Sequence, residues 1–235
     1  MIKEALQYVV GMGKAERHVV NGQEFSDKPL HLIKEPTADA VKLNSLSGMV
    51  EYLKSQYDTG EQLMVHVVDP ETVVAFDQLN VDMNRSKYVR ADALLPEFSF
   101  DRWYDAETFN IKMQSCFVKN DDKDIMLKIV GNIKEDQVRT TGDDGTSQVV
   151  TAKVGVASVS DVIVPNPVLL RPFRTFVEVE QPESAFVFRM KDGPSCALFE
   201  ADGGAWKLEA MQNVKAYLEA HLSDEIEAGK IIVIA

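Results

Sequence analysis

Apolar residues recur at the three- and four-residue spacing of an amphipathic helix in four stretches of the chain. The stretch nearest the N-terminus has its apolar side chains at Ile2, Ala5, Leu6, Val9 and Val10. Gly11 and Gly13 follow directly, and glycine disfavours helical backbone, so the helix should stop there. The sequence therefore predicts a short helix at the start of the chain.

Three later stretches have the same periodicity. Asn44 or Ser45 can cap the first of them and Gly60 closes it, and its apolar face consists of Leu46, Met49, Val50 and Leu53. Asp105 can cap the next, whose apolar face consists of Phe109, Met113, Cys116 and Phe117. Cys116 is therefore expected to be a core thiol. The last stretch, near the C-terminus, presents Leu208, Met211, Val214, Leu218 and Leu222.

Runs rich in β-branched and alternating residues predict strands elsewhere. These strands cover residues 64–68, 72–76, 87–91, 125–133, 148–156, 175–180, 185–190 and 197–200. Turn-forming residues at 69–71, 142–145 and 181–184 separate neighbouring runs, which predicts three antiparallel hairpins. The β-prone tail Ile231–Ile234 should also pair into the sheet, because an exposed apolar strand would promote aggregation.

Together these elements predict an α+β fold. We expect a mostly antiparallel β-sheet with about four helices packed on it, ending in a strand-loop-helix-strand unit. A chain of 235 residues can bury a substantial core, and no internal repeat or low-complexity linker divides it. We therefore expect a single domain over residues 1–235, with a proline-rich internal connection near residues 164–172.

The charge and cysteine content narrow the classes of function. The chain carries 37 acidic and 25 basic residues, and its net charge of −12 repels phosphate backbones and anionic membranes at long range. No apolar run reaches the ~18 residues of a membrane span, and the N-terminus lacks the pattern of a secretion signal. Neither Cys116 nor Cys196 has a partner at zinc-binding spacing. We expect an acidic, cytoplasmic protein with reduced thiols, no membrane partner, no metal and no cofactor, and we leave nucleic-acid binding open.

No motif in the sequence specifies a catalytic site. The Gly11 to Gly13 segment resembles part of a phosphate-binding loop, but it follows a helix and lacks the lysine and hydroxyl residue of that motif. The turn at 142–145 holds two aspartates without the distal glutamate of a calcium loop. The histidines are scattered, at His18, His31, His66 and His221. We predict no catalytic residue from the sequence, so catalysis would require groups that converge only in the fold.

The segment Asp202-Gly203-Gly204 is one candidate binding site, because it lies at a predicted helix start. Free backbone amides and the helix dipole can hold an anion there, and glycine allows close approach. Alternatively, Asp202 caps the helix itself and occupies those amides.

The segment 171–174 is the second candidate. Its arginines, Arg171 and Arg174, flank a proline and a phenylalanine and can contact a phosphate or a carboxylate partner. Alternatively, these arginines pair with Glu178 or Glu180 within an acidic protein.

Three stretches carry a resemblance to known proteins: residues 1–13, residues 165–190 with the run L-R-P-F-R-T-F-V-E-V-E-Q-P, and residues 199–206, F-E-A-D-G-G-A-W. In these stretches the chain resembles a protein family carried by prophages of Gram-positive bacteria, and the resemblance extends over the whole chain. It is more distantly similar to the YfdQ-like phage protein family. Neither family has established catalytic residues, so the resemblance implies a temperate-phage accessory protein of the host cytoplasm and no particular chemistry.

Four hypotheses follow for the function. The first is a non-enzymatic homo-oligomer that binds a host or phage protein in phage DNA replication or recombination. The second is an acidic inhibitor that presents carboxylates to a host nucleic-acid-binding or defence protein. The third is an enzyme whose carboxylates or histidines converge in the fold. The fourth is a binder of single-stranded nucleic acid that stacks bases on Trp103, Tyr104 and Phe173.

Overall fold

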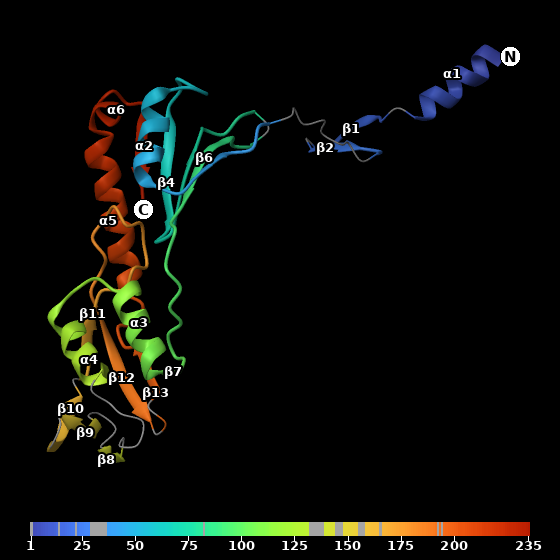
Figure 1. The fold of residues 1–235 in the computed structure, drawn as a ribbon. Coiled ribbons are helices and arrows are strands. Elements are labelled where there is room, and N and C mark those ends of the chain that lie inside the picture. Colours follow the sequence, from blue (N-terminus) through green and yellow to red (C-terminus); the bar gives the residue numbers. More distant parts are fainter. Residues whose placement is uncertain are drawn as a thin grey trace. The chain divides into compact units, whose positions relative to one another are not determined.

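The chain divides into two compact units, Met1–Ala38 and Asp39–Ala235. The computed structural model (Figure 1) describes residues 2–13, 15–21, 23–28, 37–81, 83–131, 139–143, 148–154, 158–164, 166–191, 193 and 195–235. The proline-rich connection expected near residues 164–172 falls inside the second unit.

The first unit contains one helix and one hairpin. Helix α1 (Ile2–Met12) confirms the predicted N-terminal helix, although it continues through Gly11 before it ends. Strands β1 (Arg17–Val20) and β2 (Gln23–Ser26) pair in antiparallel fashion. None of the residues of α1 is buried, so the described residues of this unit form no core around the helix.

A five-stranded mixed sheet organises one half of the second unit. Its strands, in spatial order, are β14 (Ile231–Ile234), β4 (Leu63–Asp69), β5 (Thr72–Phe76), β6 (Lys87–Asp92) and β3 (Val41–Leu43). The two edge strands run parallel to their neighbours, and the inner pairs are antiparallel. The predicted pairing of the C-terminal tail is therefore confirmed, with β14 beside β4.

Two helices bury their apolar faces on this sheet. They are α2 (Leu46–Ser55) and α5 (Trp206–His221), and a short helix α6 (Ser223–Glu227) leads from α5 to β14. We call the buried cluster that they share with the sheet the five-stranded core; it includes Leu46, Met49, Leu53, Val65, Val73, Val89, Phe176, Val214 and Leu218. The predicted face of α5 is partly wrong, because Leu208 is 66% exposed and Ala210 is buried instead.

A four-stranded antiparallel sheet organises the other half of the second unit. Its order is β11 (Val168–Leu170), β12 (Ser184–Lys191), β13 (Ser195–Glu200) and β7 (Tyr104–Asp105). Helices α3 (Ala106–Cys116) and α4 (Asp121–Gly131) pack on it. Their shared cluster, the four-stranded core, includes Phe109, Met113, Cys116, Phe117, Met126, Ile129, Leu170, Phe186, Phe188 and Leu198. Cys116 is a buried core thiol, as expected.

A third sheet consists of β8 (Arg139–Asp143), β9 (Gln148–Val154) and β10 (Ser158–Val164). The antiparallel pairing of β8 with β9 confirms a hairpin around residues 142–145, part of whose turn lies outside the described residues. Its first strand is β8, however, and not the predicted strand 125–133. The hairpin predicted at 69–71 is likewise confirmed by β4 and β5.

The fold is α+β, with mostly antiparallel sheets and four helices packed on the two larger ones, as the sequence predicted. The caps are also where the sequence places them: Ser45 Oγ accepts from the Gly48 amide at 3.1 Å, and Asp105 Oδ1 accepts from the Thr108 amide at 2.8 Å. The C-terminal strand-loop-helix-strand unit is present, but its strands β13 and β14 belong to different sheets. None of the helices formed by the described residues combines the length and apolar character that a membrane span requires.

The strand predicted at 125–133 is wrong, because its described residues belong to helix α4. Asn120 Oδ1 accepts from the Lys123 amide at 2.9 Å and so caps the start of this helix. Asp121, Asp122 and Asp124 fall in its first turn, where the helix dipole favours negative charge. The buried side chains Met126, Ile129 and Val130 have helical spacing. The strand was predicted because isoleucine has a high β-propensity.

The strand predicted at 175–180 and the hairpin predicted at 181–184 are also wrong. Residues 175–180 form an irregular loop, and β12 pairs instead with β11 and β13. The cause is Gln181, whose side chain is buried inside the loop. Its Oε1 accepts from the amides of Arg174 (2.9 Å) and Thr175 (3.2 Å), and its Nε2 donates to the Phe176 carbonyl at 3.0 Å. The amide group thus makes hydrogen bonds that a neighbouring strand would otherwise provide.

We call residues 171–183 the connecting segment, because they link the two cores. At one end, Phe173 N donates to the Cys116 carbonyl, next to the four-stranded core. Further along, Phe176 is buried in the five-stranded core. The Thr175 hydroxyl donates to the Pro70 carbonyl in the β4–β5 turn, and Glu178 accepts from the Ser47 amide at the start of α2. One loop therefore contacts elements of both cores.

Replacing Gln181 with methionine should destabilise the protein by at least about 3 kcal/mol, because buried amides and carbonyls would lose their partners without gaining water. Chemical denaturation followed by circular dichroism measures this change. The matched control is Gln78→Met at an exposed position, for which we expect a change within about 0.5 kcal/mol. Equal effects of the two substitutions would contradict the role assigned to Gln181.

Candidate binding groove

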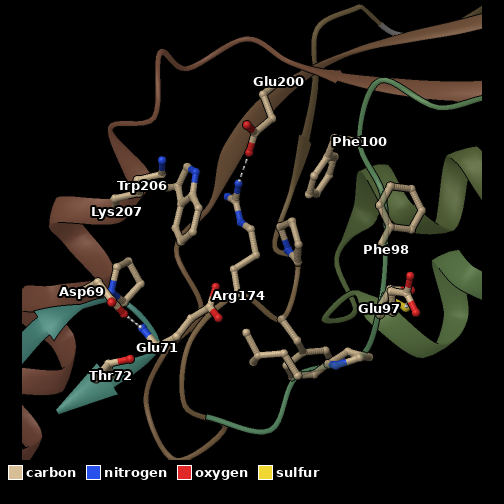
Figure 2. Close-up of a pocket in the computed structure, with 16 residues that line it drawn as sticks. Asp69, Glu71, Thr72, Glu97, Phe98, Phe100, Arg174, Glu200, Trp206 and Lys207 are labelled. Carbon is tan, nitrogen blue, oxygen red and sulfur yellow. Dashed lines mark hydrogen bonds and ion pairs between the residues drawn. The ribbon is translucent and has the colours of Figure 1, made fainter. Parts of the chain in front are cut away.

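A groove of about 790 Å³ lies in the second unit, where the chain passes between the two cores (Figure 2). The β4–β5 turn, the link between β6 and β7, the connecting segment and the start of α5 all contribute to it. Its aromatic and proline lining consists of Pro70, Pro96, Phe98, Phe100, Pro172, Phe173 and Trp206. Its charged lining consists of Asp69, Glu71, Glu97, Glu200, Arg174 and Lys207. The groove thus combines flat apolar surfaces with several carboxylates.

Arg174 is the most deeply buried charged residue of the groove and is only 6% exposed. Its Nη1 donates to Glu200 Oε1 at 2.7 Å, and its Nη2 donates to the Ser184 hydroxyl. Its guanidinium carbon lies 3.9 Å from the centre of the Trp206 ring and 5.8 Å from that of Phe100. Figure 2 shows the side chain between these two rings. Arg174 therefore orders the aromatic lining through cation–π contacts.

The ionisation of Arg174 follows from this environment. Burial lowers the pKa of its guanidinium, and the negative charges of Glu200 and Asp202 partly offset that effect. An arginine remains protonated even so, and its buried charge needs these acids as partners. The two terminal nitrogens of the guanidinium are consequently committed to Glu200 and Ser184, whereas its buried Nε has no hydrogen-bond partner among the described residues.

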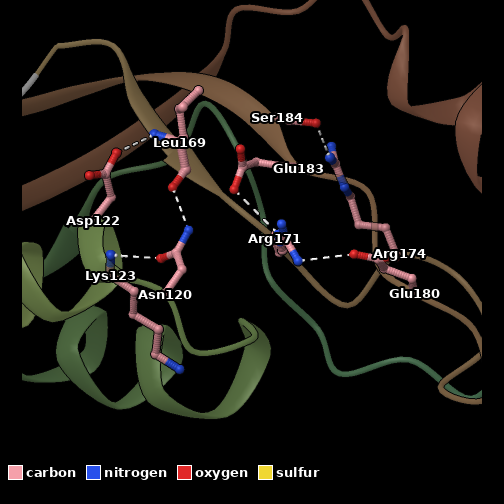
Figure 3. Close-up of polar contacts among 9 residues, drawn as sticks. All are labelled: Asn120, Asp122, Lys123, Leu169, Arg171, Arg174, Glu180, Glu183 and Ser184. Atoms are coloured by element: carbon pink, nitrogen blue, oxygen red, sulfur yellow. Dashed lines mark hydrogen bonds and ion pairs between the residues drawn. The ribbon is translucent and has the colours of Figure 1, made fainter.

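Arg171, the other arginine of the predicted site, lies nearer the surface. Its Nη1 donates to Glu180 at 3.1 Å and its Nε to Glu183 at 3.3 Å, as Figure 3 shows. The ion pair with Glu180 is one of the two pairings expected from the sequence. Glu178, the other expected partner, accepts from the Ser47 amide at the start of α2 instead. Such exposed pairs contribute little stability. The two arginines have separate partners, and the lining of the groove includes Arg174 but not Arg171.

The Asp202-Gly203-Gly204 loop precedes α5, as predicted. Gly203 and Gly204 have φ angles of +64° and +81°, a region that glycine adopts without strain. Asp202 Oδ1 accepts from the Gly204 amide at 3.0 Å, and the Asp202 carbonyl accepts from the Ala205 amide. The amides of the turn thus donate within the loop, and Ala205, the N-cap of α5, makes no side-chain capping bond.

Asp202 also belongs to the electrostatic surroundings of Arg174. Burial raises the pKa of its carboxyl group, but hydrogen bonds from Ser184 and the Gly204 amide, with the charge of Arg174, outweigh burial and lower it. The structure therefore brings Asp202 and Arg174, two of the predicted site residues, into one network, in which the aspartate stabilises the buried cation.

The net charge of the groove lining is negative when the ion pair between Arg174 and Glu200 is not counted. Glu200 is paired with Arg174, which leaves Asp69, Glu71 and Glu97 beside Lys207. Asp69 Oδ1 accepts from the Glu71 amide at 2.8 Å, and the side chains of Glu71 and Glu97 lie at exposed positions. A positively charged group would find favourable electrostatics here, whereas a phosphate would be repelled.

Sequence reasoning missed most of this lining. Phe98 and Phe100 lie in the stretch Pro96-Glu97-Phe98-Ser99-Phe100, which connects β6 to β7. Two aromatic residues in a proline-containing loop were the available signal, because loops that position aromatic side chains often carry function. Trp206 was missed since it stood inside a helical pattern. In the described part of the chain, no three histidine, cysteine or acidic side chains cluster as a metal site would require.

Comparison of the chain with family models, with curated proteins and with solved structures finds no match.

Removing Glu200 should cost more stability than removing Arg174. The Glu200→Ala variant leaves a buried guanidinium without its main partner, which we expect to destabilise the protein by about 2 kcal/mol. The Arg174→Met variant removes the buried charge, keeps an apolar stem, and leaves Glu200, which is 39% exposed, free to be hydrated. Urea unfolding of both variants measures the difference. A larger loss for Arg174→Met would contradict this account.

Asp202 should make the stability depend on pH in acid. Because its folded-state pKa is below the ordinary value, its contribution is present above about pH 4 and is lost as the pH falls through the lowered pKa. The free energy of unfolding should therefore fall more steeply below about pH 4 in the wild type than in Asp202→Asn. Parallel pH profiles for the two proteins would contradict the assigned shift.

Proposed function

We propose that this protein acts by binding, and that its groove holds a segment of a partner protein that carries lysine or arginine side chains. The observation that carries the proposal is the combination of aromatic and proline surfaces with Asp69, Glu71 and Glu97 in one groove. Proline and aromatic side chains offer rigid, flat contact area at low entropic cost, and the carboxylates complement a basic residue.

The alternative of nucleic-acid binding has less support at this site. A nucleic-acid groove combines stacking residues with cations along the backbone path, whereas acids outnumber cations in this groove. The cation most suited to phosphate, Arg174, is already paired with Glu200 and Ser184. A partner chosen by positive charge is therefore the better match to a chain with a net charge of −12.

The resemblance to prophage proteins suggests the biological process in which this binding activity takes part. We propose an accessory protein of phage DNA replication or recombination, working as a homo-oligomer in the host cytoplasm, whose partner is itself a basic, nucleic-acid-binding protein. The acidic groove equally supports a second candidate, an inhibitor that occupies the basic surface of a host defence protein. The two candidates share the recognition chemistry and differ in the partner.

Selection of a displayed random-peptide library on the purified protein tests the recognition chemistry. We expect enrichment of sequences that combine lysine or arginine with apolar residues. In a Trp103→Phe background, Trp206 is the only tryptophan, so its fluorescence reports binding in the groove directly. The enriched peptides should change that fluorescence in a saturable way.

The Glu71→Gln/Glu97→Gln variant should bind these peptides roughly three- to tenfold more weakly, because two partly solvated charge interactions are lost. Glu227→Gln, at an exposed position of α6, is the matched charge control and should bind like the wild type. The proposal fails if no sequence is enriched, or if enriched peptides bind the groove variant and the wild type equally.

A further inference from the structure

The described residues of the first unit expose nearly all of their apolar side chains. Ile2, Leu6, Val9 and Val10, the stripe that the sequence predicted on α1, are 60–80% exposed. Further large apolar side chains that are at least half exposed are Tyr8, Met12, Val19, Val20 and Phe25. Among the described residues of the first unit, no buried apolar core packs against these nine side chains.

A unit of this size and composition does not become stable by itself. An isolated helix as short as α1 is marginal in water, and so is an isolated two-stranded hairpin. Domains below about 40 residues need disulfides, a metal or oligomerisation. Residues 1–38 contain no cysteine, and their described part gathers no group of metal-ligating side chains. Packing against another surface remains as the means of stabilisation.

The charge of this segment favours a second copy of the same chain as that surface. Residues 1–38 contain five basic and five acidic residues, so the whole net charge of −12 belongs to the rest of the chain. A two-fold symmetric contact places the same patch on both sides, and a neutral patch avoids meeting its own charge. The segment is not basic enough to be attracted to an anionic membrane.

The amount of apolar surface also suits a contact between copies. Burying an aliphatic side chain removes roughly 60–120 Å² of apolar surface from water. Nine such side chains, about two-thirds exposed on average, therefore offer roughly 340–680 Å² of apolar surface. This range includes the apolar share, somewhat over half, of the ~800 Å² that each partner contributes to a standard interface.

We propose that residues 1–28 are a self-association element, in which the apolar stripe of α1 and the β1–β2 hairpin pack against the same segment of a second copy. This interface is separate from the groove: it specifies how the proposed homo-oligomer forms, and it does not depend on what the groove binds. It would present two grooves in one assembly, so that a multivalent partner gains avidity.

Light scattering coupled to gel filtration of the full-length protein tests this inference. We expect at least twice the monomer mass of 26.2 kDa for the wild type. The Leu6→Glu/Val9→Glu variant places two charges in the stripe and should elute as a monomer, with its dissociation constant raised at least tenfold. Val81→Glu, at a position that is 99% exposed in the second unit, is the matched control and should keep the wild-type mass.

Each other outcome overturns the inference. A monomeric wild type excludes self-association, and sedimentation with vesicles of anionic lipid would then identify a membrane surface as the partner. A monomeric wild type that loses thermal stability in Leu6→Glu/Val9→Glu would show that the stripe packs on its own chain. An oligomer that survives the double substitution would place the contact between copies elsewhere.

Discussion

The structure of the second unit depends on one buried amide group, that of Gln181. Its oxygen accepts from two backbone amides and its nitrogen donates to carbonyls of the same loop, so a segment with no strand partner can remain inside the protein. Because this loop is fixed, Phe176 reaches the five-stranded core while Phe173 stays beside the end of α3. The two cores are thereby joined through hydrogen bonds as well as through apolar contact.

The groove is a consequence of that junction. The chain passes between the cores at the link from β6 to β7, in the connecting segment and before α5, and each passage contributes lining residues. Arg174 lies among them, and its pair with Glu200 and its contact with the Trp206 ring hold the aromatic surface in place. A preorganised surface of this kind loses little side-chain entropy when a ligand binds. The remaining carboxylates then determine which ligand is favoured, namely a positively charged one.

The elements with a strong local signal were the ones that the sequence could predict. Ser45 and Asp105 mark helix starts through their side-chain oxygens, and the alternation in β4 reflects one buried face. Residues 175–180 were misassigned because their β-branched composition is local, whereas the bonds made by Gln181 depend on its burial between distant elements. The groove was invisible for the same reason: Phe100 and Trp206 are 106 positions apart and meet only through Arg174. Of the predicted site residues, Arg174 and Asp202 share a network, which no spacing in the sequence could reveal.

We infer that the connecting segment makes the two cores one cooperative unit and so keeps the groove formed in the absence of a ligand. Native-state hydrogen exchange tests it most directly, through the amides of Arg174 and Thr175 that donate to Gln181. The account predicts that these amides exchange with the same free energy of opening as the β4–β5 and β12–β13 ladders, because all of them open only in global unfolding. Fast exchange of Arg174 and Thr175 while both ladders remain protected would contradict it, since the cores would then move independently and the groove would not be preformed.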